Sequence, residues 1–85
     1  MNDVPVLFVI FYPEQEIYKT KWREIFLKET LEQWRIPYID TKILFLDAAR
    51  TPEVQIGDFY LPDGHLSPRG NAVVAQAVAD YFKYQ

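Results

Sequence analysis

Residues 4–12 constrain the fold most, because this run, Val-Pro-Val-Leu-Phe-Val-Ile-Phe-Tyr, contains no charged side chain. An apolar run without alternation is typical of a strand that is buried on both faces, as in the parallel sheets of α/β proteins. The run lacks the basic residues and the small-residue cleavage site of a signal sequence, and it is too short to cross a bilayer. We therefore expect a strand over residues 4–11.

The residues after this strand predict a helix and a second strand. We expect the helix over 16–35, because acidic residues come early in it and Pro37 follows it. A short strand is expected over 37–41, and residues 43–46 could either continue that strand or form a helical turn. Two strands joined by a helix form a βαβ unit with parallel strands. The sequence thus predicts a small α/β fold of the type βαβ(α).

Composition limits the functions open to the chain. Hydrophobic residues make up 49% of it, which excludes a disordered chain, and the absence of repeats and linkers indicates a single domain over 1–85. The formal net charge of −3 gives no electrostatic basis for binding nucleic acid or an anionic membrane. With no cysteine and a single histidine, we expect no disulfide, no metal and no other cofactor. The lack of a signal sequence predicts a cytoplasmic location if Met1 is the true start.

A helix start signal stands at Ser67-Pro68. A serine hydroxyl can accept a hydrogen bond from a free backbone N–H at a helix N-terminus, and proline at the first helical position loses no N–H that the helix needs. We expect this helix over 68–83, lying flat on a sheet with its small and apolar residues buried. Ser67 is the only serine of the chain, so the alternative role is a nucleophile. A hydroxyl two residues from His65 is, however, poorly placed for proton transfer to that imidazole.

The only histidine, His65, follows Asp63 by two residues in a turn-rich stretch. An imidazole has an ordinary pKa of ~6.5 and can act as a base near neutral pH when a carboxylate orients it. The alternative is structural, because Pro-Asp-Gly is also ordinary turn chemistry.

The string Phe-Tyr-Leu-Pro-Asp-Gly-His-Leu-Ser-Pro-Arg-Gly-Asn over 59–71 resembles the last conserved block of SGNH/GDSL-type ester hydrolases, which carries their catalytic Asp and His. Residues 34–40 resemble the helix-to-strand passage before that block, and residues 6–12 resemble the preceding strand. The resemblance therefore covers essentially the whole chain. It implies the C-terminal portion of a flavodoxin-like SGNH fold, with His65 as the general base and Asp63 as the carboxylate that fixes its tautomer.

The chain departs from the family pattern in two ways. Most members space the pair as Asp-x-x-His, whereas Asp63 and His65 have the Asp-x-His spacing similar to that of the polysaccharide O-acetyltransferase branch. No Gly-Asp-Ser block is present, and no segment resembles the Gly and Asn blocks that form the oxyanion hole. We therefore expect a C-terminal segment that supplies His65, and Asp63 with it, to an ester hydrolase or O-acyltransferase site and is inactive alone. The alternative is a non-enzymatic α/β association module derived from that fold.

The helix expected over 16–35 has two apolar faces. At 100° per residue one face holds Tyr18, Trp22, Ile25 and Phe26, and the opposite face holds Leu27, Leu31 and Trp34. The two faces could pack on different parts of one core, or one of them could bind a partner. A two-stranded sheet also leaves open edges. We therefore expect as partner either a second copy, which gives a homodimer, or a complementary N-terminal hydrolase half.

Overall fold

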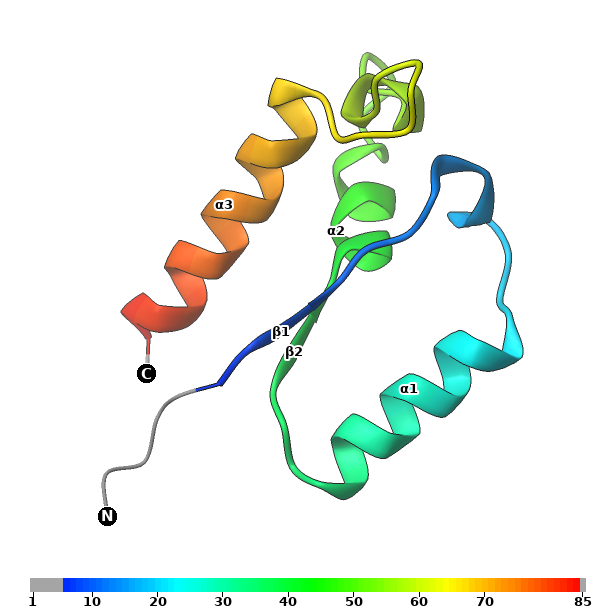
Figure 1. The fold of residues 1–85 in the computed structure, drawn as a ribbon. Coiled ribbons are helices and arrows are strands. Elements are labelled where there is room, and N and C mark those ends of the chain that lie inside the picture. The colour runs from blue at the N-terminus through cyan, green and yellow to red at the C-terminus, as the bar shows by residue number, and fades with distance from the viewer. Residues whose placement is uncertain (1–5, 85) are drawn as a thin grey trace.

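A two-stranded parallel sheet runs between one helix and two others (Figure 1). The computed structural model describes residues 6–84. The elements in chain order are β1 (Phe8–Ile10), the short 3-10 helix η1 (Glu14–Glu16), α1 (Trp22–Gln33), β2 (Tyr38–Asp40), α2 (Thr41–Ala48), the 3-10 helix η2 (Ile56–Phe59) and α3 (Pro68–Lys83). The predicted fold class, a small α/β unit with parallel strands, is confirmed.

The strands are shorter than the sequence predicts. β1 and β2 have three residues each and pair in parallel, with Ile10 opposite Asp40. Their positions agree with the expected ranges 4–11 and 37–41, although residues 4 and 5 lie outside the described part of the chain. Since parallel neighbours need a crossover connection, α1 and its flanking loops span the distance between the strand ends.

Helix α1 begins later than expected, at Trp22 rather than near residue 16. The preceding residues form η1 and an irregular link to the helix. After the helix, Arg35 takes the left-handed conformation, with φ 56°, and the N–H of Ile36 donates to the carbonyl oxygen of Leu31 at 2.8 Å. This backbone bond satisfies a helix-end carbonyl and turns the chain into β2.

The alternative left open for residues 43–46 is decided in favour of a helix. α2 starts directly after β2, because the carboxylate of Asp40 accepts a hydrogen bond of 3.0 Å from the backbone N–H of Lys42 and so caps the helix. Phe45 of α2 stacks on Phe59 of η2, with ring centroids 4.6 Å apart. The buried core consists of Ile17, Phe45, Ile56, Phe59, Tyr60 and Val74.

Helix α3 begins at Pro68, as predicted, but it packs mainly against α2 and η2 rather than flat on the sheet. Gly70 and Val74 are its buried residues, and the small side chains of Ala72, Ala75 and Ala79 are exposed. The prediction of a buried small-residue face is wrong, because strands of three residues offer too little surface to cover a helix of this length. Gly70 allows the close approach, since a Cβ there would lie 2.3 Å from the carbonyl oxygen of Phe59.

Of the two apolar faces expected on α1, neither forms a continuous buried surface. Leu31 is its buried residue, and both Trp22 and Trp34 are exposed. Among the described residues, none of the helices combines the length and the apolar character needed to span a bilayer.

Candidate functional site

The loop between η2 and α3 carries Asp63 and His65 at its tip. An antiparallel bridge closes the base of the loop. Within it, the N–H of Leu61 donates to the carbonyl oxygen of His65 at 2.7 Å, and the N–H of Gly64 donates to that of Leu61 at 3.0 Å. Gly64 has φ 93°, a conformation that glycine adopts without steric cost. Backbone bonds and one glycine therefore fix the loop.

The structure brings the two predicted site residues together. One carboxylate oxygen of Asp63 accepts the backbone N–H of His65 at 3.0 Å, and the other lies 3.1 Å from Nδ1 of the same residue. These interactions lower the pKa of Asp63 below its usual value, the backbone N–H more than the imidazole. When Nδ1 carries the proton, its N–H can donate to Asp63, and Nε2 is then the basic nitrogen. Because the His65 side chain is 81% exposed, Nε2 is accessible from outside the chain.

The loop lies at the end of the molecule toward which both strands run (Figure 1). The hydroxyl of Tyr60, at the start of the loop, donates to the carbonyl oxygen of Tyr12, two residues after β1, at 2.8 Å. In open α/β sheets, ligands bind outside the carboxyl ends of the strands. Asp63 and His65 therefore belong to the end of the fold at which such sites form.

Ser67 is a helix cap, as predicted. Its Oγ accepts the N–H of Gly70 at 3.1 Å and donates to the carbonyl oxygen of Asp58 at 2.6 Å. The side chain is buried. Since the hydroxyl proton and one lone pair are both engaged with the backbone at the start of α3, the geometry gives Ser67 a structural role.

Four charged side chains that the sequence reasoning did not single out form a cluster between α1 and the strands. Lys28 pairs with Glu24, at 2.9 Å, and with Asp40, while Lys42 pairs with Glu24. Each of the four side chains is at most 22% exposed. Two positive and two negative charges balance, so the cluster joins α1 to β2 and α2 without a net charge. Of the ion pairs in the cluster, only that of Glu24 with Lys28 has a sequence signal, the i,i+4 spacing of a helical ion pair.

Neighbouring charges in the cluster favour the charged forms of Glu24 and Lys28. Burial alone would raise the pKa of Glu24, but hydrogen bonds from Lys42 and Lys28 outweigh it and hold that pKa below its usual value. Burial alone would lower the pKa of Lys28, but Asp40 and Glu24 raise it instead.

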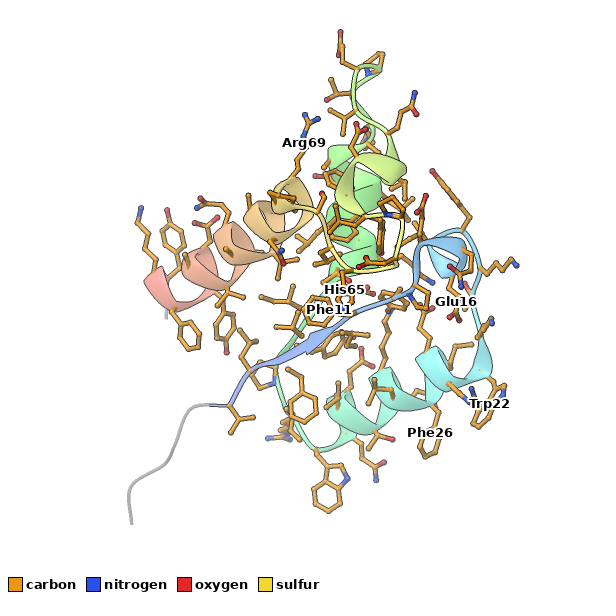
Figure 2. All side chains as sticks on the ribbon, turned by 45° about the horizontal axis from the view of Figure 1, so that its top comes forward. Phe11, Glu16, Trp22, Phe26, His65 and Arg69 are labelled. Carbon is orange, nitrogen blue, oxygen red and sulfur yellow. The ribbon has the colours of Figure 1, made fainter. Side chains whose placement is uncertain are left out.

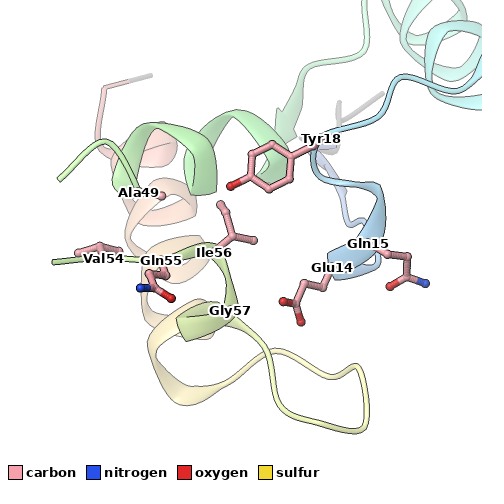
Figure 3. Close-up of a pocket in the computed structure, with 8 residues that line it drawn as sticks. All are labelled: Glu14, Gln15, Tyr18, Ala49, Val54, Gln55, Ile56 and Gly57. Atoms are coloured by element: carbon pink, nitrogen blue, oxygen red, sulfur yellow. The ribbon is translucent and has the colours of Figure 1, made fainter. Parts of the chain in front are cut away.

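A separate hollow of about 730 Å³ lies between η1 and the segment around η2 (Figure 3). Its lining residues are Glu14, Gln15, Tyr18, Ala49, Val54, Gln55, Ile56 and Gly57. Burial and the carboxylate of Glu14 raise the pKa of the neighbouring Tyr60 to about 12. Neither Asp63 nor His65 lines the hollow, so the structure does not connect it with the predicted site.

Within residues 6–84, no three histidine or acidic side chains gather as a metal site would require. Comparisons of the chain with models of protein families, with curated proteins and with solved structures found no match.

Proposed function

We propose that this chain is the C-terminal segment of an SGNH/GDSL-like ester hydrolase or O-acyltransferase, inactive alone, and that it supplies His65 to a nucleophile carried by another segment. The observation that carries the proposal is the 3.1 Å contact between Nδ1 of His65 and Asp63, combined with the exposure of that imidazole. The carboxylate of Asp63 holds the imidazole at Nδ1, and Nε2 is accessible from outside the chain. The resemblance of residues 59–71 to the family's last block supports the same assignment.

In this proposal the residues of the chain handle the proton. Nε2 of His65 takes the proton of an incoming serine hydroxyl as the oxygen attacks an ester carbonyl, and Asp63 stabilises the imidazolium that results. The same nitrogen then returns the proton to the leaving alkoxide. The donors that stabilise the oxyanion come from the completing segment.

Two measurements test the part of the proposal that says the isolated chain is inactive. We expect the rate of aryl acetate hydrolysis to stay at the level of free imidazole, and we expect a serine-reactive phosphonate to leave Ser67 unlabelled. Both results follow from the engagement of its hydroxyl with the backbone. Stoichiometric labelling of Ser67 together with turnover would make this serine the nucleophile and overturn the proposal.

A second candidate function is association without catalysis. It is favoured by a specific observation, the exposure of Trp22 and Phe26 on one helix, because large apolar groups that gather on a surface mark interaction sites. This function involves neither Asp63 nor His65. Its partner would be a second copy of the chain or the complementary hydrolase half.

A further inference from the structure

The hollow between η1 and the segment around η2 combines one charged group with an apolar floor. Figure 3 shows the carboxylate of Glu14 and the ring of Tyr18 projecting into it from one wall, opposite Ile56 and Gly57 on the other. The side chains of Ile56 and Val54 supply apolar surface. The volume of about 730 Å³ falls in the range of sites for small molecules. The hollow can therefore hold a small molecule that has one polar and one apolar end.

Glu14 gives the hollow a negative charge. None of the lining residues is cationic. Glu16, two residues further along η1 (Figure 2), pairs with Lys21 at 3.2 Å, whereas Glu14 makes no ion pair within residues 6–84. The charge of Glu14 also contributes to the raised pKa of Tyr60. A cation in the hollow would thus meet a carboxylate that has no other charged partner among the described residues.

We propose that the hollow binds a primary ammonium ion with a compact apolar body. The ammonium group donates to the carboxylate of Glu14 and to the side-chain oxygen of Gln55, since an ammonium carries three N–H donors. The apolar body packs on Ile56 and Val54 beneath the ring of Tyr18. An anion of the same size is repelled by Glu14. This binding function is independent of the proposed hydrolase chemistry, because His65 does not line the hollow.

Gly57 keeps the space between the two walls open. A Cβ at this position would lie 3.5 Å from Oε2 of Glu14, so a larger side chain would extend into the hollow. That distance is an ordinary van der Waals contact, and Gly57 is not among the residues with positive φ. The backbone therefore accepts a side chain here without strain, and what the glycine provides is room beside the carboxylate.

Titration of the full chain with three probes of similar size and different charge, followed by amide NMR, tests the proposal. The probes are benzylammonium, benzyl alcohol and benzoate at pH 7. We expect benzylammonium to bind with a Kd of about a millimolar, with shifts confined to residues 14–18 and 49–57. Benzyl alcohol should bind about five-fold more weakly, and benzoate should not bind. Equal affinity for the three probes, or shifts spread over the whole surface, would overturn the proposal.

Two variants locate the site. Glu14→Gln keeps the shape of the side chain and should remove the preference for benzylammonium over benzyl alcohol. Glu29→Gln is the matched control, because it makes the same change in net charge at an exposed position of α1 outside the hollow. It should bind as the wild type does. An unchanged preference in Glu14→Gln would overturn the role of this carboxylate.

Gly57→Leu fills the hollow and should abolish the binding of both benzylammonium and benzyl alcohol. Circular dichroism checks that the variant is folded, and Glu14→Gln decides the question if it is not. Binding to folded Gly57→Leu with wild-type affinity would place the probe elsewhere and overturn the proposal. His65→Ala should leave the binding unchanged, so the ammonium site and the hydrolase proposal can fail separately.

Discussion

Replacing Glu24 by glutamine should destabilise the fold strongly, because this carboxylate holds two lysines inside the charged cluster. Removing one partner of a buried ion pair costs about 3–5 kcal/mol. Lys28 keeps Asp40 as a partner and is 22% exposed, so we expect the lower end of that range, about 3 kcal/mol. A domain of 85 residues has a total stability of about 4–13 kcal/mol. The substitution should therefore remove a large share of it.

Urea unfolding followed by circular dichroism measures the loss, and Glu32→Gln is the matched control. Glu32 stands on the same helix, is exposed, and accepts the hydroxyl of Tyr38 at 2.8 Å, a bond that a glutamine oxygen can keep. We expect the control to stay within about 0.5 kcal/mol of the wild type. A similarly small effect of Glu24→Gln would refute the structural role of the cluster.

The contribution of Glu24 to stability should also depend on pH. The pKa of Glu24 in the folded chain lies below the ordinary value of 4.5. Its contribution to stability is therefore present above pH 4.5 and is lost as the pH falls through the folded pKa. Below pH 4.5 the wild type should lose stability more steeply than Glu24→Gln, and parallel curves would contradict the pKa shift.

Three further predictions concern single residues. Ser67→Ala should lower the free energy of unfolding in urea by about 0.5–2 kcal/mol through loss of the cap, and an unchanged value would contradict that role. The pKa of Tyr60 is raised to about 12, so its contribution to the stability of the fold should be fully present below pH 10 and should be lost as the pH rises toward 12. Tyr60→Phe should flatten this alkaline loss in pH-dependent circular dichroism. Asp63→Asn should shift the neutral imidazole of His65 away from the Nδ1–H tautomer in nitrogen NMR, and an unchanged tautomer would show that Asp63 does not orient the ring.

The parts of the fold predicted well are those fixed by neighbouring residues. Ser67 and Pro68 determine the start of α3 through a capping bond that spans three residues. Asp63 and His65 meet because a short turn joins them. The apolar run before Pro13 predicts the position of β1 correctly. The expected burial on both faces is wrong, because Phe8 and Phe11 are exposed and Ile10 is the buried residue of the strand.

The parts that the sequence did not predict depend on distant residues. Lys42 pairs with Glu24 from 18 positions away, and no local spacing in the sequence indicates this pair. The apolar pattern of α3 indicated burial, but the short strands left most of that helix outside the sheet. The capping role of Asp40 could have been predicted, because Asp is a preferred residue at the position before a helix.

Reconstituted ester hydrolysis tests the central proposal most directly. The experiment joins this chain to an adjacent coding segment that carries a Gly-Asp-Ser block and measures aryl acetate turnover. We predict a rate above that of free imidazole, lost in His65→Ala, retained in Ser67→Ala, and reduced by up to about 10⁴ in Asp63→Asn, by analogy with the serine-protease aspartate. Absence of any such segment, or turnover that survives His65→Ala, would contradict the assignment of His65 as the base.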